Sequence, residues 1–316
     1  MASLSVPPVP TDPRRDAVDL HRAFKGLGCD STTVIAILAH RDASQRALIQ
    51  HHYMAIYHQD LLHRLASELS GNHKKAVLLW VLDPATRDAA ILHQALNGDV
   101  TDMRAATEVV CSRTPSQMRV VRQAYLSRFG GHLEQHVAAR ASGDHQRLLL
   151  AYLRCPRYEG PEADPAAGAR DARELYRAGE RRLGTDERTF IRIFSERSAA
   201  HMASVAAAYH HMYDRSLEQA VKSETSGNFG FGLLTIIRCA ESPAKYFAKV
   251  LHKAMKGLGT NDTALMRVVT TRAEVDMQYI KAEYHRSYKR SLADAVHAET
   301  SGNYRTFLLS LVGRDR

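Results

Sequence analysis

The chain has 316 residues, of which 45% are hydrophobic and 24% charged, and its formal net charge is +9. This composition is typical of an ordinary folded protein rather than a disordered one. The longest purely apolar run, residues 76–82, is too short to cross a bilayer, and the first residues contain no secretory signal pattern.

The charge and the cysteines narrow the classes of partner and site. A surplus of basic residues favours anionic partners, either phospholipid headgroups or nucleic acid. No zinc-finger, RNP or homeodomain pattern accompanies the basic residues, so we predict no nucleic-acid binding. The four cysteines lack CxxC spacing, and without a secretory signal we expect reduced thiols and a cytoplasmic protein.

In chain order, a short tail over residues 1–13 precedes a series of short amphipathic helices. Residues 16–24 carry apolar side chains at helical spacing. A glycine turn ends this helix, and Asp30 or Ser31 caps a second one, which buries residues 34–38. A third helix is predicted from about Ser44 to Tyr57.

A fourth helix is predicted over about residues 60–69, and a fifth over residues 73–82. Gly71 can adopt the left-handed conformation that ends a helix, and we expect Asn72 to cap the fifth helix. Alternating strand patterns are rare along the whole chain. The fold class predicted is therefore all-α.

This five-helix unit occurs four times. Residues of one type recur in register in all four copies, and they include Arg41, Arg113, Arg197 and Arg272, and Tyr53, Tyr125, Tyr209 and Tyr284. A period of about 70 residues indicates a repeat architecture. We place the repeats at residues 14–83, 84–154, 166–242 and 243–316, with a linker at 155–165. The stretch 155–170, rich in Pro, Gly and Ala, is the expected boundary between two halves.

Two of the four repeats carry a complete set of candidate calcium ligands. The loop Gly26-Leu27-Gly28-Cys29 is followed by Glu68, and Gly257-Leu258-Gly259-Thr260 by Glu299, with the same separation between loop and glutamate in both. A glycine loop can present backbone carbonyls, and a glutamate can supply two more oxygens. Because calcium takes six to eight oxygens, water or a lipid phosphate must complete the shell, and calcium and lipid would strengthen each other's binding.

The other two repeats depart from this pattern. In the second, Arg140 replaces the glutamate and excludes such a site. In the third, Glu224 and Gly184 remain but Arg182 replaces the first glycine, so we expect that site to be empty or very weak. The alternative interpretation of the glycine loops is that they serve only as helix ends.

The leucines between the glycines, Leu27 and Leu258, are candidates for membrane contact. A leucine at an exposed loop tip is poorly solvated, and insertion into the lipid interface would bury it. The alternative is that each leucine folds back onto its neighbouring loop.

Four repeats, the KGLG(C/T) loop with its glutamate, and the Ser-Gly-Asn corner closely resemble the annexins, most of all a plant annexin. The resemblance implies a curved disc of four five-helix repeats with calcium loops on the convex, membrane-facing side. It also implies Ca²⁺ ligands, which are the carbonyls of Phe24, Gly26 and Gly28 with Glu68, and those of Met255, Gly257 and Gly259 with Glu299. Cys29 departs from the usual Thr, so hydroxyl support to that loop would be lost or weakened.

The leading prediction is a non-enzymatic protein, with no catalytic residues, that attaches to anionic phospholipid membranes when calcium rises. We expect a monomer in solution. One alternative is a redox protein with peroxidase-like activity, for which the resemblance points to His40. Another is a calcium-independent membrane or actin scaffold, because residues 191–193 match a short motif proposed for F-actin binding. That motif fits a half-buried helix equally well. A redox-sensitive pair of Cys111 and Cys239 is also left open.

Overall fold

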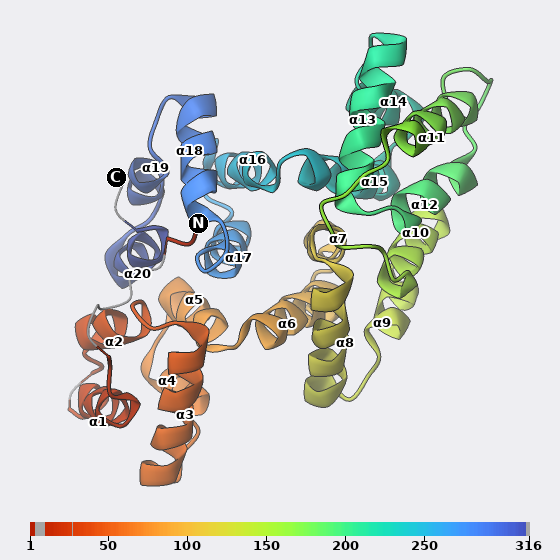
Figure 1. Cartoon of the computed structure of the whole chain (residues 1–316). Helices are drawn as coiled ribbons and strands as arrows, with labels where there is room; N and C mark the ends of the chain where they lie inside the picture. Colours follow the sequence, from red (N-terminus) through yellow and green to blue (C-terminus); the bar gives the residue numbers. More distant parts are fainter. Residues whose placement is uncertain (4–9, 27, 314–316) are drawn as a thin grey trace. The chain divides into compact units, whose positions relative to one another are not determined.

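All regular structure in the described part of the chain is helical. The computed structural model describes residues 1–3, 10–26 and 28–313, and twenty helices and no strand occur within them (Figure 1). The predicted all-α class is confirmed, as are five helices in each repeat. None of the described helices has both the length and the apolar character needed to span a bilayer.

The helices follow one another in the same order in each repeat. The first repeat contains α1 (Pro13–Ala23), α2 (Ser31–Leu38), α3 (Ala43–Tyr57), α4 (Leu61–Glu68) and α5 (Gly71–Val81). The second contains α6 (Pro84–Asn97), α7 (Met103–Ser112), α8 (Pro115–Phe129), α9 (Leu133–Arg140) and α10 (Gly143–Arg154). The third contains α11 (Pro165–Ala178), α12 (Glu187–Glu196), α13 (Ala199–Tyr213), α14 (Leu217–Glu224) and α15 (Gly227–Glu241). The fourth contains α16 (Pro243–Met255), α17 (Asp262–Arg272), α18 (Met277–Tyr288), α19 (Leu292–Glu299) and α20 (Gly302–Val312).

The chain forms two compact units that do not follow the halves of the sequence. One unit comprises residues 1–87 and 247–316, and the other residues 88–246. Repeat 1 therefore packs with repeat 4, and repeat 2 with repeat 3. The expected boundary between halves at residues 155–170 is wrong, because this stretch lies inside the second unit. Repeats 1 and 4 share a unit because the two ends of the chain pack side by side. There Ser3 Oγ donates to the Leu311 carbonyl over 2.6 Å.

The recurring arginines form ion pairs rather than a binding site. Three of them pair with an aspartate that also recurs, with distances of 2.6–2.7 Å between Nε and the carboxylate, in Arg41–Asp16, Arg113–Asp88 and Arg197–Asp171. In repeat 4 the partner of Arg272 is Asp276, on the turn that follows, at 2.6 Å. Arg41, Arg113 and Arg272 are buried and Arg197 is partly exposed, so each aspartate balances a charge that is wholly or partly removed from water.

The corner between the fourth and fifth helices differs from the prediction at one residue. The fifth helix of repeat 1 begins at Gly71, and its N-cap is Ser70, so the prediction that Asn72 caps it is wrong. Gly71 has a φ of 59°, the left-handed conformation expected for it, and it is already the first residue of the fifth helix. Asn72 instead donates to Asp262 Oδ2 over 2.8 Å and so links repeat 1 to repeat 4.

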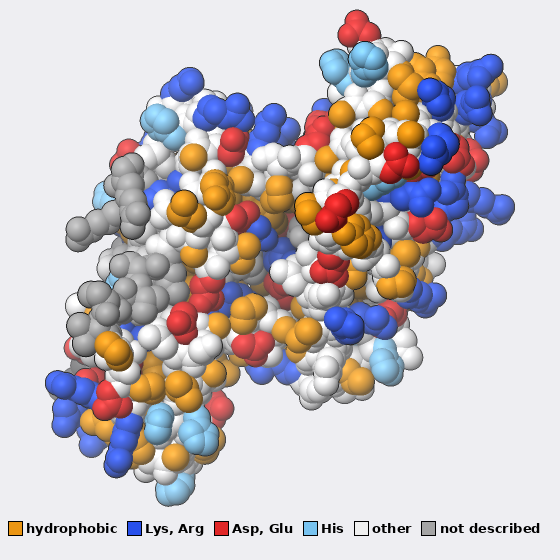
Figure 2. All heavy atoms as spheres, in the orientation of Figure 1, with side chains coloured by type: hydrophobic (Ala, Val, Ile, Leu, Met, Phe, Trp, Pro, Cys, Tyr) orange, Lys and Arg blue, Asp and Glu red, His pale blue; other side chains and the backbone are white. Residues whose placement is uncertain are grey.

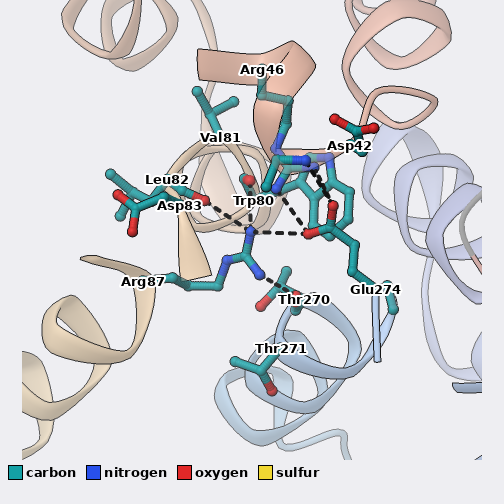
Figure 3. A network of polar contacts seen from close by, with 12 residues as sticks. Asp42, Arg46, Trp80, Val81, Leu82, Asp83, Arg87, Thr270, Thr271 and Glu274 are labelled. Atoms are coloured by element: carbon teal, nitrogen blue, oxygen red, sulfur yellow. Dashed lines mark hydrogen bonds and ion pairs between the residues drawn. The ribbon is translucent and has the colours of Figure 1, made fainter. Parts of the chain in front are cut away.

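A buried polar network also joins residues of repeats 1, 2 and 4 within the first unit (Figure 3). The Arg46 guanidinium lies 3.9 Å from the Trp80 ring centroid, and that of Arg87 lies 5.0 Å from it. Glu274, from repeat 4, accepts from Arg46 over 3.0 Å and lies 4.0 Å from Arg87. Since both arginines are almost fully buried, this carboxylate balances charge that would otherwise be costly inside the protein.

Candidate calcium sites

The predicted loops of repeats 1 and 4 have the same unusual backbone. The first glycines, Gly26 and Gly257, have φ values of 122° and 116°, and the second glycines, Gly28 and Gly259, have values of 96° and 88°. Residues with a Cβ rarely adopt these angles. A Cβ added at any of the four would meet no atom within 4 Å. Glycine is therefore required by the path of the chain and not by crowding.

In repeat 4 the loop is joined to its predicted glutamate. Glu299 is the last residue of α19, and Met255, whose carbonyl is a predicted ligand, is the last residue of α16. Thr260 Oγ1 donates to Glu299 Oε2 over 3.0 Å, and its distance to the Glu299 carbonyl is 3.3 Å. Among the described residues no Lys or Arg forms an ion pair with Glu299. Its carboxylate thus remains beside the loop with its charge available to a cation.

In repeat 1 the glutamate is held differently. Cys29 stands where repeat 4 has Thr260, and no hydroxyl among the described residues donates to Glu68. Instead Glu68 Oε1 lies 2.9 Å from Arg64 Nη2, and the same nitrogen donates to the Phe24 carbonyl over 3.2 Å. One guanidinium therefore contacts two predicted calcium ligands. Burial raises the pKa of the Cys29 thiol, and the Glu68 charge raises it further.

Repeat 3 has the glutamate of a site without the loop. Thr185 Oγ1 donates to Glu224 Oε2 over 2.8 Å, which repeats the arrangement of Thr260 and Glu299. Gly184 has a φ of 78°, but Arg182 is absent from the described residues with positive φ. The arginine therefore changes the backbone path where repeats 1 and 4 have their first glycine. In repeat 2, Arg140 is exposed at the end of α9.

The residues of repeats 1 and 4 fit a hard cation. Within residues 1–3, 10–26 and 28–313, no three His, Cys, Asp or Glu side chains gather as a metal-binding group. A metal at these loops would therefore depend on backbone carbonyls and one carboxylate, which are ligands that calcium accepts and zinc seldom uses. Hydroxyl support from a threonine at the position of Thr260 was expected. The contacts of Arg64 were not, although Arg64 precedes Glu68 by one helical turn, a spacing that brings two side chains together.

The loop tips of repeats 3 and 4 are apolar and exposed. Leu258 and Leu183, at the equivalent position of repeat 3, are both fully exposed, and Val100 of repeat 2 is largely exposed. Leu27 lies outside the described residues. The alternative that Leu258 folds back onto its neighbouring loop is wrong for this chain, because none of its side-chain surface is covered.

The surface charge is not uniform. Figure 2 shows Lys and Arg gathered over α11 and α12 of repeat 3, with acidic side chains interspersed elsewhere on the same face. The exposed basic residues of this region are Arg170, Arg173, Arg177, Arg181, Arg182 and Arg188. Such a cluster attracts anionic surfaces, and salt weakens that attraction.

The residues behind the alternative functions lie in helices or directly beside them. His40 follows α2, and its carbonyl accepts from Arg41 Nη1 over 3.2 Å. Ile193 is fully buried and Arg192 pairs with Glu174, as expected for a half-buried helix. None of the four cysteines, all of which lie in the described part of the chain, is in a disulfide, and burial raises the pKa of Cys111.

The comparisons with known proteins agree with one another. A family model described as Annexin matches residues 15–80, 87–152, 170–236 and 246–311. Annexin D5 of Arabidopsis thaliana is 51% identical over 313 residues, which cover 99% of each chain. The solved structure of annexin III has a TM-score of 0.96 at 33% identity and covers 100% of this chain and 98% of its own. A calcium-bound annexin (Sm)1 has a TM-score of 0.86 at 30% identity, covering 99% and 93%.

These matches confirm the expected resemblance, including its plant character, since the Arabidopsis relative shares half of its residues with this chain. Four matches to one family model, in register with the four five-helix repeats, leave few residues of the chain unassigned. The chain belongs to the annexin family, whose members bind phospholipids in a calcium-dependent way.

Proposed function

We propose that repeats 1 and 4 each bind a calcium ion and that each ion links the protein to the phosphate of an anionic phospholipid. The ligands would be the carbonyls of Phe24, Gly26 and Gly28 with Glu68, and those of Met255, Gly257 and Gly259 with Glu299. The observation that carries this proposal is the near-identical glycine conformation of the two loops, which the loops of repeats 2 and 3 do not share.

The protein and the lipid would each supply part of the coordination shell. Calcium, when bound, supplies positive charge and open positions for phosphate oxygens. The glycine loop positions carbonyls, and the glutamate neutralises part of the ion's charge. The exposed Leu258 adds an apolar contact, whose insertion contributes at most about 1.5–3 kcal/mol.

The test is calcium-dependent sedimentation with vesicles rich in phosphatidylserine. The double variant Glu68→Gln/Glu299→Gln should lose the calcium-dependent part of binding. The matched control is Glu174→Gln/Glu283→Gln, which removes the same charge from two surface ion pairs, with Arg192 and Arg286. Wild-type calcium dependence in the first double variant would refute the assignment of these sites.

We further propose that membrane attachment, and not catalysis, is the role of the chain, and that it moves from the cytoplasm to membranes as a monomer when calcium rises. Peroxide turnover lost in His40→Ala would favour the redox alternative. The actin alternative gains no support from residues 191–193, because Ile193 is buried and Arg192 is paired. Cosedimentation with F-actin in the absence of calcium would support the actin alternative.

A further inference from the structure

Arg64 lies where a cation would be bound in repeat 1. One of its terminal nitrogens, Nη2, is 2.9 Å from Glu68 Oε1 and 3.2 Å from the Phe24 carbonyl oxygen. The guanidinium carbon also lies 5.8 Å from the Phe24 ring centroid. Both oxygens belong to the ligand set proposed for calcium. The guanidinium therefore satisfies them with positive charge from the protein itself.

No other repeat has this arrangement in the part of the chain that the structure describes. The register of the repeats places His136, Ala220 and Ala295 at the positions equivalent to Arg64. The side chain of Ala295 cannot donate to Glu299, whose carboxylate is held by the neutral hydroxyl of Thr260. Repeats 1 and 4 thus share a loop but differ in the charge beside their glutamate.

Moving the Arg64 guanidinium away from Glu68 and the Phe24 carbonyl should cost little free energy. Its side chain is 32% exposed, so water screens the ion pair. Its Nε is buried without a hydrogen-bond partner, which makes the bound position less favourable than a fully satisfied one. A doubly charged ion that engages several oxygens can therefore displace the guanidinium, but only against this competition.

We propose that Arg64 sets the calcium affinity of repeat 1, because its guanidinium competes with Ca²⁺ for Glu68 and the Phe24 carbonyl. This inference rests on the proposed function of the loop. It assigns the two sites different thresholds: repeat 4 fills first as calcium rises, and repeat 1 fills at higher calcium. The chain would then attach through one bridge before it attaches through two.

The test isolates repeat 1 by calorimetric calcium titration of Glu224→Gln/Glu299→Gln protein. In this background, Arg64→Met should tighten calcium binding about two- to tenfold, the range expected when a partly exposed ion pair no longer competes. The matched control is Lys25→Met. Lys25 is exposed beside Phe24, and its loss removes the same charge without freeing either ligand.

A second readout does not depend on affinity. In the same background with Arg64 intact, the ¹⁵N-labelled arginine side-chain spectrum should contain, besides the protected signals of buried arginines such as Arg46 and Arg87, one guanidinium signal that is absent in Arg64→Met. That signal should lose its protection from exchange when calcium is added. Equal tightening by Lys25→Met, or no tightening by Arg64→Met, would overturn direct competition and leave the calcium site intact. If neither protein bound calcium at repeat 1, the proposed site itself would be refuted, and the role of Arg64 with it.

Discussion

The loops of repeats 1 and 4 have one backbone and two electrostatic environments. Their φ values are 122° and 116° at the first glycine and 96° and 88° at the second, yet Glu299 is held by a hydroxyl and Glu68 by a guanidinium. The backbone is fixed by residues inside the loop. Whether a neutral or a charged group contacts the glutamate is fixed by residues outside the two glycines, namely Arg64 and the residue after the second glycine. A loop motif therefore locates a site but does not determine how strongly that site binds.

The largest effect on this comparison should come from Glu299→Arg, which copies Arg140 of repeat 2 into repeat 4. The change removes the only carboxylate of the proposed ligand set and adds a positive charge, so calcium binding at repeat 4 should weaken about a hundredfold or more. Calorimetric titration in a Glu224→Gln background would then detect only repeat 1. Two remaining sites in that titration would mean that Glu299 is not a ligand.

The second-largest effect is expected from adding a Cβ at the first glycine of each loop. Gly26→Ala and Gly257→Ala should each destabilise the first unit by about 1–2 kcal/mol, because a Cβ is strained at φ values of 122° and 116° although nothing crowds it. Urea unfolding monitored through Trp80, which lies in this unit, measures both variants. Unequal costs for the two would show that the loops are less alike than their φ values indicate.

The comparison also shows what sequence alone could predict. Glycine spacing identified both loops because left-handed backbone is a local property of a few residues, and helix number followed from local periodicity. The pairing of repeat 1 with repeat 4 is not local. It depends on contacts such as Ser3 with Leu311 and Asn72 with Asp262, between residues far apart in the sequence. The stretch 155–170 resembles a boundary because its composition is that of a linker, although it lies inside one unit.

The sites were predicted less completely than the loops. The bond between Arg64 and Glu68 could have been read from their spacing on a predicted helix. The contact of Arg64 with the Phe24 carbonyl could not, because it depends on how α4 packs against the end of α1. The cap at Ser70 rather than Asn72 likewise depends on the φ of Gly71, which sequence shows only as a possibility.

A smaller effect is expected from removing the hydroxyl that holds Glu299. Thr260→Val keeps the shape of the side chain and deletes the donor to Oε2. Calcium affinity at repeat 4 should fall about three- to tenfold, which corresponds to one hydrogen bond to a charged group that no longer orients the carboxylate. The control is Thr185→Val, which deletes the same bond to Glu224 in repeat 3 and should leave the repeat 4 affinity unchanged. An unchanged affinity in Thr260→Val would show that the carboxylate needs no support.

The smallest effect is expected from placing a threonine in repeat 1 at the position that Thr260 has in repeat 4. Cys29→Thr should let a hydroxyl donate to Glu68 in competition with Arg64, and a neutral donor leaves the carboxylate charge available to calcium. In the Glu224→Gln/Glu299→Gln background, affinity at repeat 1 should rise about two- to fivefold. The gain should shrink in an Arg64→Met protein, where no guanidinium remains to be displaced, and this non-additivity would show that the two residues act on the same carboxylate. Fully additive gains would mean that the hydroxyl and the guanidinium affect the loop independently, and the difference between repeats 1 and 4 would then have two separate causes.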